Sequence, residues 1–306
     1  MTACLALAGC PAQPSYPSTI TPIYAATRAG YLWVYDGTGW TGNSAGGITG
    51  TSIVVDGSGS TAQLFAATVA GVSEYQGGSW KALSNPAAAP VKSLTIGTNL
   101  FAGGGGGVSV LNADGSTWSN DVSVANVNSV VSLGSFTYAA ARSGLYVYNG
   151  TSVAATYTPS QVLGTSTTVT SVFVDSSGDI IAGTDTGLAV LYDSPTGSGN
   201  FASLGLPAGT SINQVTVDAV GNLYAAAGSG GGLYILSPDS SGTFVLAAHV
   251  LTGSTVNCVC VDGAGTLYAG TPSGLLQSQD TGSTWATQLA GQNVSAVATT
   301  APLYRF

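Results

Sequence analysis

The sequence predicts an all-β fold, a β-propeller of seven four-stranded antiparallel blades, and three observations support this prediction. A short motif, in which an aromatic residue or Ile is followed by Ala and then by Ala or Gly, recurs along the 306 residues. Its seven copies begin at Tyr24, Phe65, Phe101, Tyr138, Ile181, Tyr224 and Tyr268. Neighbouring copies lie 36 to 44 residues apart, which is the period of a propeller blade. Short runs of alternating apolar and polar residues, bounded by Gly, Asp, Ser and Asn, predict β-hairpins, and no segment has sustained helical periodicity.

Each of the fuller repeats contains four predicted strands. The first is an apolar alternation that ends in Asp, as in Val172–Asp175 and Val215–Asp218. A Gly-containing turn leads to the second strand, which carries the repeated motif. The third strand begins at Gly, as in Gly144–Tyr148, and a polar turn leads to the fourth, which often begins with Trp. In the third repeat the run Gly103–Gly107 replaces the usual loop and predicts a flexible turn. Four such strands arranged radially bury both faces of a blade against its neighbours.

The two ends of the sequence predict how the ring closes. The N-terminal repeat begins almost at its second strand, whereas Val294–Ala298 resembles a first strand without a partner. We expect this C-terminal strand to complete the first blade, because that pairing removes two exposed sheet edges at once. The tail, residues 302–306, resembles the start of another second strand, so a ring of eight blades with a truncated last blade is the alternative.

The composition excludes several classes of partner. Charged residues make up only 6% of the chain, and the net charge of −8 reflects a shortage of Lys and Arg, of which there are five. Nucleic-acid binding requires clusters of these residues to displace counterions from phosphate, and electrostatic binding to anionic membranes requires them too. We therefore expect no nucleic acid, and a membrane only through a lipid anchor. The few acids also predict tolerance of low pH, because few carboxylates must be protonated.

Residues 1–19 are predicted to be a targeting segment and tether, and residues 20–306 a single propeller domain. Leu7–Cys10 resembles the lipobox of bacterial lipoproteins, in which small residues precede a Cys that receives lipid after signal cleavage. The segment departs from that pattern because no Lys or Arg precedes its apolar run, and an apolar N-terminus without this role is the alternative. The resemblance implies lipidation of Cys10 and a lipid-anchored place in the bacterial cell envelope. A secreted protein is the other expectation.

The most specific motif lies in turns between third and fourth strands. Residues 278–285 match Ser-x-Asp-x-Gly-x-Thr-Trp at every defined position, namely Ser278, Asp280, Gly282, Thr284 and Trp285. Residues 112–118 form a shortened copy that keeps Asp114 and Trp118. The chain thereby resembles the Asp-box (BNR-repeat) propeller superfamily over nearly all of residues 20–306. That superfamily includes sialidases, glycanases, receptors, assembly factors and envelope proteins. The resemblance therefore implies a fold, and structural roles for these residues, without implying one activity.

No catalytic constellation is predicted. Sialidases of the superfamily use three Arg, a Tyr–Glu pair and an acidic proton donor, whereas the only Glu here is Glu74, inside a predicted strand. Ten of the thirteen acids fall in the first-to-second or third-to-fourth strand turns, which antiparallel geometry places on one face. His249 is the only histidine, and Cys258 and Cys260 have no second pair of ligands, so we expect no metal and no cofactor.

The opposite face is the predicted binding surface. It carries the second-to-third strand loops, and one position in them, four residues after the motif's first residue, can be compared around the ring. In three repeats a charged residue departs from the small or apolar residues found elsewhere, namely Arg28, Arg142 and Asp185. A mouth with few, varied charges on a rigid scaffold is where ligands are usually held. We therefore predict a ligand site around these three residues, with exposed charges of no consequence as the alternative.

The sequence favours a non-catalytic envelope or secreted propeller that acts as a binding or assembly scaffold for a protein or glycan partner. A divergent carbohydrate-active enzyme, a glycoside hydrolase or lyase, is the first alternative, and two aspartates facing one cleft would favour it. A repetitive surface-layer or adhesive protein is the second, since the composition is rich in Gly, Ser and Thr and low in charge.

Overall fold

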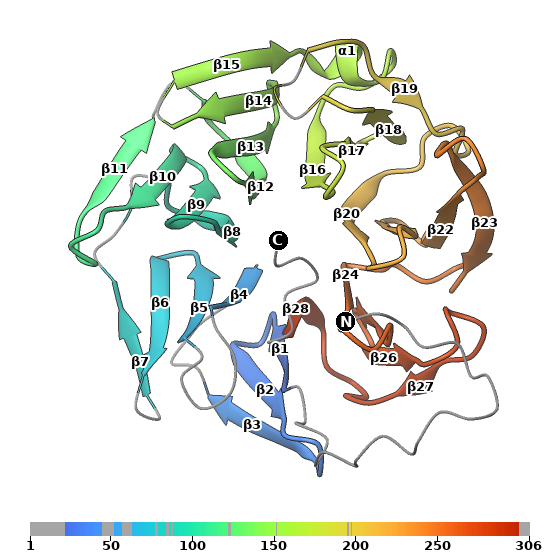
Figure 1. Cartoon of the computed structure of the whole chain (residues 1–306). Helices are drawn as coiled ribbons and strands as arrows, with labels where there is room; N and C mark the ends of the chain where they lie inside the picture. The colour runs from blue at the N-terminus through green and yellow to red at the C-terminus, as the bar shows by residue number, and fades with distance from the viewer. Residues whose placement is uncertain are drawn as a thin grey trace, which may run out of the picture.

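A computed structural model describes residues 22–44, 52–56, 63–76, 79–83, 86, 88–121, 124–150, 152–194, 196 and 198–299. These residues form seven four-stranded antiparallel sheets, arranged as blades around a central channel (Figure 1). The predicted seven-bladed propeller is therefore confirmed. The targeting segment expected over residues 1–19, and with it Cys10, lies outside the described residues.

The strands occupy four concentric positions. The innermost are β4 (Ser52–Asp56), β8 (Val91–Ile96), β12 (Val127–Leu133), β16 (Val169–Val174), β20 (Ile212–Val217), β24 (Cys258–Val261) and β28 (Val294–Thr299). The second are β1 (Ile23–Thr27), β5 (Gln63–Thr68), β9 (Leu100–Gly104), β13 (Phe136–Ala141), β17 (Ile180–Thr184), β21 (Leu223–Ala227) and β25 (Leu267–Thr271). The third are β2 (Tyr31–Tyr35), β6 (Gly71–Gln76), β10 (Gly107–Leu111), β14 (Gly144–Asn149), β18 (Leu188–Leu191), β22 (Gly232–Pro238) and β26 (Gly274–Ser278). The outermost are β3 (Trp40–Ser44), β7 (Ser79–Ala82), β11 (Trp118–Asp121), β15 (Ser152–Tyr157), β19 (Ala202–Ser203), β23 (Phe244–Val250) and β27 (Ala286–Thr287).

The C-terminal strand closes the ring as predicted. Blade 1 consists of β28, β1, β2 and β3, and blades 2 to 7 each take the next four strands in chain order. β28 pairs antiparallel with β1, with Ala25 opposite Val297 and Ala26 opposite Ala296. This pairing gives seven blades in the described part of the chain and covers the inner edge of β1. One turn of helix, α1 (Pro159–Val162), lies in the connection from blade 4 to blade 5, and Thr158 caps it through a reciprocal bond with Gln161.

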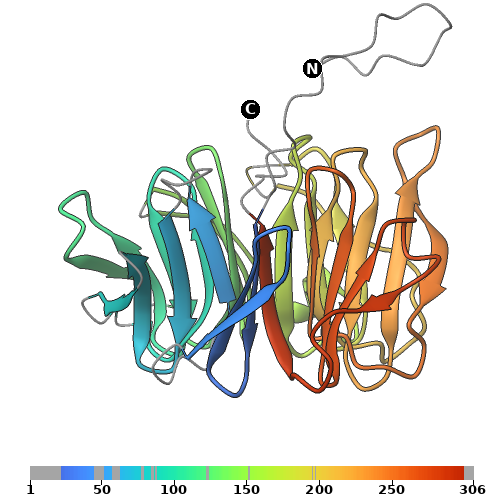
Figure 2. The same ribbon diagram turned by 90° about the horizontal axis from the view of Figure 1, so that it is seen from below.

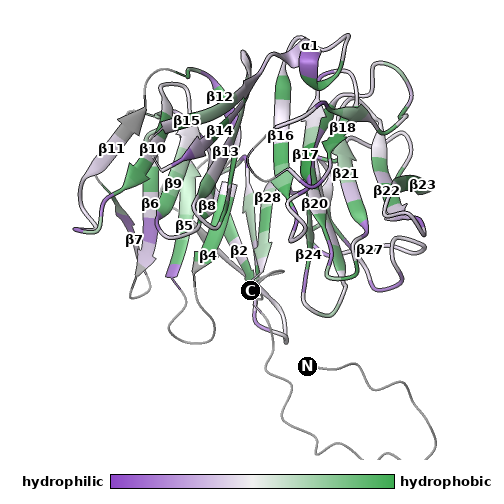
Figure 3. Cartoon of the chain, turned by 45° about the horizontal axis from the view of Figure 1, so that its top comes forward, coloured by the Kyte–Doolittle hydropathy of each residue, from purple (hydrophilic) through white to green (hydrophobic). Residues whose placement is uncertain are grey.

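The apolar core is divided among the interfaces between blades. Seven clusters of buried apolar side chains lie in these interfaces, one for each neighbouring pair of blades. The second strands are buried on both faces, as in β17, β21 and β25, where every residue is buried. This position explains the repeated motif, because small Ala and Gly residues let the sheets pack closely. Figure 3 shows apolar residues along the strands and hydrophilic residues mainly in the connections.

The ring has two faces, which we name after their connections (Figure 2). The turn face carries the first-to-second and third-to-fourth strand turns, and the loop face carries the second-to-third turns and the connections between blades. On the turn face, Asp175, Asp218 and Asp262 follow inner strands, and each accepts two backbone N–H groups through Oδ1 at 2.8–3.0 Å. These side chains hold the turns closed, which explains why the first strand of the repeat ends in Asp.

The Tyr that begins the motif in two repeats also contacts this Asp. The hydroxyl of Tyr224 donates to Asp218 Oδ2 at 2.9 Å, and Tyr268 makes the equivalent bond to Asp262 at 3.4 Å. The two sequence features that define the repeat are therefore joined in space, each satisfying a polar group of the other.

The glycine run of blade 3 differs from its prediction. Gly103 and Gly104 belong to β9 and Gly107 begins β10, so only two residues form the turn. A Cβ on Gly104 would lie 2.1 Å from the carbonyl oxygen of Ala88. The expectation of a flexible turn over the whole run is therefore wrong, because part of the run is buried strand that needs glycine for close backbone approach.

Candidate functional site at the channel mouth

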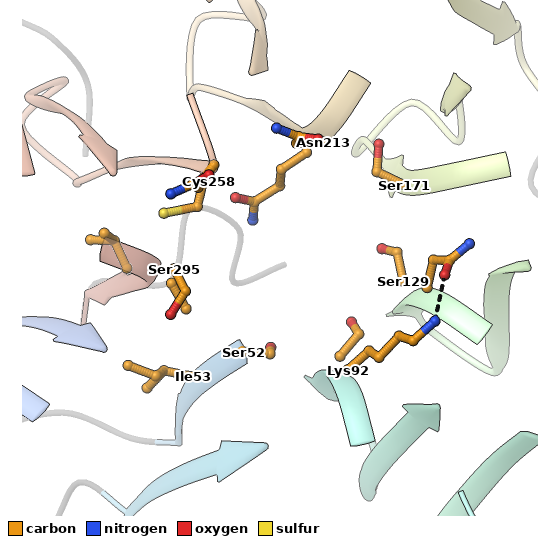
Figure 4. Close-up of a pocket in the computed structure, with 14 residues that line it drawn as sticks. Ser52, Ile53, Lys92, Ser129, Ser171, Asn213, Cys258 and Ser295 are labelled. Carbon is orange, nitrogen blue, oxygen red and sulfur yellow. Dashed lines mark hydrogen bonds between the residues drawn. The ribbon is translucent and has the colours of Figure 1, made fainter. Parts of the chain in front are cut away.

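A polar cavity of about 110 Å³ opens at the loop-face end of the central channel. It is lined by residues at the beginnings of the inner strands, and Figure 4 shows their side chains arranged around it. Its polar lining includes Ser52, Lys92, Asn128, Ser129, Asn213 and Asn257. Farther along the channel the lining becomes largely apolar, with Val55, Ile96 and Val261 among its residues.

The polar ring is built by a repeated irregularity of the inner strands. In five blades one residue of the inner strand has no partner opposite it on the second strand, and the register shifts by one. These unpaired residues are Lys92, Asn128, Thr170, Asn213 and Ser295. A β-bulge redirects the side chain at the extra residue, and here it places a polar side chain at the channel end of each strand.

Asparagines of the ring connect neighbouring blades. The Nδ2 group of Asn128 donates to Val169 O at 2.9 Å, that of Asn213 to Val256 O at 2.8 Å, and that of Asn257 to Val294 O at 2.8 Å. In each case the acceptor is the residue before the equivalent position in the next blade. We call this contact the asparagine lock.

The residues that follow make a second set of connections. Ser52, Ser93 and Ser129 each accept, through Oγ, a backbone N–H from the inner strand of the next blade at 3.0–3.3 Å. Gln214 Oε1 accepts from Val259 N in the same way at 2.9 Å. Inner strands have one edge without a strand neighbour, and these side chains satisfy its backbone groups. Most of the mouth's polar groups therefore hold the ring together.

Lys92 departs from this arrangement. It occupies the lock position of blade 3, but its Nζ donates to the Asn128 side-chain Oδ1 at 2.9 Å instead of to a backbone carbonyl. It is half-buried and is the only charged residue among those that line the mouth. The described lining of the mouth therefore carries one positive charge and no carboxylate.

The predicted site residues lie around the mouth on three different blades and do not line the cavity. Arg28, Arg142 and Asp185 follow the second strands of blades 1, 4 and 5, and both arginines are exposed. The backbone N–H of each donates to a carbonyl in the connection that precedes its neighbouring inner strand, at 2.9–3.2 Å. The structure thus places the three residues in equivalent positions, and no contact joins them to one another.

Asp185 is engaged within the protein. Its carboxylate accepts bonds from Thr167 N, Thr167 Oγ1 and Thr168 N at 2.5–3.3 Å. Burial disfavours the ionised form, but these hydrogen bonds outweigh it and lower the pKa of Asp185 below its ordinary value. Asp185 therefore ties the connection between blades 4 and 5 to the turn of blade 5.

On the turn face, the complete motif forms a closed turn. Asp280 accepts from Thr284 N at 2.8 Å, from Thr284 Oγ1 at 2.6 Å and from Ser278 Oγ at 2.7 Å, which lowers its pKa to about 2. Trp285 Nε1 donates to Gly282 O at 2.9 Å, and its ring packs against the cluster between blades 6 and 7. In the shortened copy, bonds from Thr117 and Ser116 likewise lower the pKa of Asp114 to about 2, but the buried Trp118 Nε1 has no partner. The shortened copy keeps a glycine, Gly115, three residues before its Trp and lacks the residue equivalent to Thr281.

A second cavity, of about 510 Å³, lies on the turn face between blades 5 and 6. It is lined by three carboxylates, Asp175, Asp179 and Asp193, and by the stacked rings of Tyr192 and Phe244. Asp179, which is 8% exposed, accepts from Asp193 N at 2.7 Å. Burial, together with repulsion between these acids, raises the pKa of Asp175 and Asp179 above the ordinary value.

These opposite shifts predict opposite effects of neutralising single acids. The raised pKa of Asp179 means that its ionised form costs stability at pH 7, and that protonation below about pH 4 removes this cost. We expect Asp179→Asn to raise the Tm at pH 7 and to lose this advantage at pH 3. Asp280→Asn should lower the Tm at pH 7, because a carboxylate with a lowered pKa stabilises the fold until the pH falls towards 2.

Thermal unfolding of both variants and the parent chain at pH 7 and pH 3 measures these effects. A destabilised Asp179→Asn at pH 7 would contradict the first. The parent fold should survive between pH 5 and pH 3, since the strongly hydrogen-bonded Asp114 and Asp280 stay ionised and Asp179 gains from protonation.

The two thiols and the imidazole in the described part of the chain have structural surroundings that explain them. Burial raises the thiol pKa of Cys258 and Cys260 to about 12, so both thiols are unreactive at neutral pH. The exposed His249 stacks on Tyr234 at a centroid distance of 4.0 Å and contacts Gly231 O at 2.7 Å. No group of three or more His, Cys, Asp or Glu in the described ranges could hold a metal ion. Among those same ranges, no helix has the length and hydropathy to cross a membrane.

The polar ring was not among the features predicted from the sequence. A signal for it exists: two polar residues precede the apolar alternation of the first strand in several repeats, as in Lys92-Ser93, Asn128-Ser129 and Asn213-Gln214. Aligning the repeats on that alternation would have placed these pairs in one column, with Lys92 as its only charge.

Comparison with known proteins supports the fold and does not assign a family. No family model and no curated protein sequence matches the chain. Among solved structures, the chain is similar to the extracellular domain of the one-component system BT4673 of B. thetaiotaomicron, with 19% identity over 79% of this chain and 35% of that one, and a TM-score of 0.65. It is also similar to PorZ, a surface component of the type-IX secretion system of Porphyromonas gingivalis, with 17% identity over 86% of this chain and 51% of that one, and a TM-score of 0.61. YCF48 from Cyanidioschyzon merolae is similar with 17% identity over 79% of this chain and 86% of that one, and a TM-score of 0.58. The chain spans about a third of the length of the first two structures found.

Proposed function

We propose that the protein is a non-catalytic binding or assembly module of the bacterial cell surface, which holds a protein or glycan partner on its loop face. The observation that carries the proposal is the division of charge between the faces. Among the described residues, those that line the mouth on the loop face include one cation and no acid, and the exposed Arg28 and Arg142 lie around it. The acids of the repeat lie on the turn face, where Asp114 and Asp280, among others, accept backbone hydrogen bonds that close their turns.

The location of the protein is part of the same proposal. Two of the similar structures are described as an extracellular domain and as a bacterial surface component, which supports a place outside the cytoplasm. Residues 1–19 would act as targeting segment and tether, with lipid on Cys10. β1 begins at the turn face, so a tether attached there would leave the loop face directed away from the membrane. The mass of the N-terminal peptide from envelope-fraction protein tests the lipidation, because an unmodified Cys10 would exclude it.

We also propose that the chain belongs to the Asp-box superfamily. The hydrogen bonds of residues 278–285 support this, since every defined residue of the motif has a structural role in that turn. Such membership adds no activity to the proposal, because the superfamily's members differ in function.

Capture of partners from an envelope fraction tests the binding proposal. The immobilised chain should enrich at least one protein or glycan, and Arg28→Ser combined with Arg142→Ser should reduce that enrichment roughly tenfold, as expected when charge-assisted contacts are lost. Lys81→Ser, which removes an exposed lysine on the outer strand β7, is the matched control and should capture as the parent does. Equal capture by the double variant and the parent would overturn the role of Arg28 and Arg142.

The turn-face cavity favours a second candidate function, a divergent glycoside hydrolase or lyase. Asp175, Asp179 and Asp193 share one cleft with two aromatic rings, and raised carboxyl pKa values suit a general acid. The bonds from Ser177 N and Asp179 N to Asp175, and from Asp193 N to Asp179, weigh against it, because they assign these carboxylates to turn closure. Hydrolysis of any member of a polysaccharide panel that is abolished in Asp179→Asn would establish the enzyme. A panel without such activity leaves the binding module as the function.

A further inference from the structure

We propose that Lys92 makes the channel mouth a site for a carboxylate carried on a small, hydroxyl-rich ligand, of which a uronic acid is the simplest example. The inference deepens the proposed function and rests on it, because both use the loop face. It adds a residue that the sequence analysis did not assign to the site, and it specifies the chemistry of the ligand.

The repeat itself marks Lys92 as an exception. At the equivalent position Asn128, Asn213 and Asn257 each donate to a backbone carbonyl of the next blade. Lys92 makes no such bond, and its ammonium group instead reaches the side chain of Asn128 at the mouth (Figure 4). An asparagine at this position could bond to the next blade as it does in three other blades. Packing between blades therefore does not explain why a lysine is present here.

Within the described residues, the ammonium group has one hydrogen-bond partner. Lys92 has three N–H donors, and one of them is used by Asn128 Oδ1 at 2.9 Å. No carboxylate within the described part of the chain contacts it, and Asp185, an acid of this face, is bound to Thr167 and Thr168. An anion bound beside the half-buried ammonium group would supply a counter-charge and accept from its remaining N–H donors.

The mouth also restricts the class of anion. Its described lining offers a single positive charge and no arginine, which matches a monoanionic carboxylate better than a phosphate dianion, for which bidentate arginine or several cations are typical. The rest of the rim consists mainly of neutral amides and hydroxyls, whose oxygens can accept from ligand hydroxyls. Asn213 can also donate, because its bond to Val256 O uses one of its two Nδ2 hydrogens. A volume of about 110 Å³ admits one small polar group and excludes a large apolar one.

The Asn128 side chain holds the ammonium group in place. Its Nδ2 is fixed by Val169 O, so its Oδ1 has a defined position for Lys92 to bond. A ligand carboxylate that takes the two remaining ammonium hydrogens need not break this bond. The site is therefore preformed, which lowers the entropic cost of binding.

Titration of the full chain with D-galacturonate, followed by isothermal calorimetry and by backbone amide NMR, tests the inference. The parent should bind galacturonate saturably at millimolar concentration and should not bind D-galactose, which has the same hydroxyls and no carboxylate. Lys92→Asn should weaken galacturonate binding roughly tenfold or more, as expected for loss of a hydrogen bond to a charged group. Its Tm should stay at or above that of the parent, because asparagine can form the lock with Val127 O. Lys81→Asn is the matched control and should bind as the parent does.

Three results would overturn the inference: no saturable binding of galacturonate to the parent, equal binding of galactose, or unchanged galacturonate binding in Lys92→Asn. A fall in the Tm of Lys92→Asn together with unchanged binding would assign Lys92 to ring packing alone. The proposed function fails separately, through equal capture of partners by the Arg28 and Arg142 double variant. Loss of capture in that variant without galacturonate binding would keep the function and reject the ligand.

Discussion

A chain that ends at Asn293, directly before β28, is expected to lose cooperative thermal unfolding. β28 is the innermost strand of blade 1, and its removal exposes the inner edge of β1. It also opens two apolar clusters, because Ala296 and Ala298 pack between blades 1 and 2, and Val294 and Val297 between blades 7 and 1. Burying a Val side chain contributes roughly 1.5–3 kcal/mol, so the combined loss approaches the 5–15 kcal/mol total stability typical of a folded protein.

The matched control is a chain that ends at Thr299, which keeps all of β28. Circular dichroism melts should show one sharp transition for this control and a broad or absent transition for the chain that ends at Asn293. A sharp transition in both would contradict closure by β28, because the ring would then hold without its last strand.

Gly144→Ala is expected to destabilise the protein by about 3 kcal/mol or more, through strain and steric conflict. Gly144 begins β14 with φ +146°, a conformation that side chains rarely adopt. A Cβ there would lie 2.0 Å from the carbonyl oxygen of Tyr157, which belongs to the outer strand of the same blade. The backbone cannot yield at this point without breaking the pairing of β14 with β15.

Gly134→Ala separates the two causes within the same blade. Gly134 has φ +58° in the turn between β12 and β13, and nothing lies within 4 Å of a Cβ built on it. It should cost about 1 kcal/mol, the conformational part alone. Urea unfolding at 25 °C measures both variants, and equal losses would show that the close approach to Tyr157 is not limiting.

Most of the fold could be predicted from the repeat, because its elements serve the same purpose in each blade where they occur. The Asp that ends a first strand closes a turn, and the Tyr of two motifs bonds to it, as Tyr224 does to Asp218. Closure could also be predicted, because Val294–Ala298 repeats the pattern of an inner strand. These features depend on neighbours in the chain or on the repeat period, so a single sequence reveals them.

The site was less accessible from the sequence. The side-chain direction of Lys92 and Asn128 depends on a one-residue bulge, which no alternation of apolar and polar residues records. The bonds of Asp185 depend on Thr167, which precedes it by 18 residues and belongs to another element. Comparison of the repeats therefore identified the unusual charges of the loop face, whereas the cavity residues required the positions of adjacent blades.

Blocking one face at a time tests most directly the claim that the loop face is the binding surface. Val69, 62% exposed, and Val220, 78% exposed, lie in turns of the loop face and the turn face respectively. In a chain whose Cys4 and Cys10 are replaced by Ser, Val69→Cys and Val220→Cys can each be coupled to a 5-kDa maleimide polyethylene glycol. The buried Cys258 and the half-buried Cys260 should stay unmodified, because the raised pKa of both thiols keeps them protonated at neutral pH. Capture from an envelope fraction should be lost when Val69→Cys is coupled and retained when Val220→Cys is coupled. Capture lost only on coupling at the turn face would contradict the account.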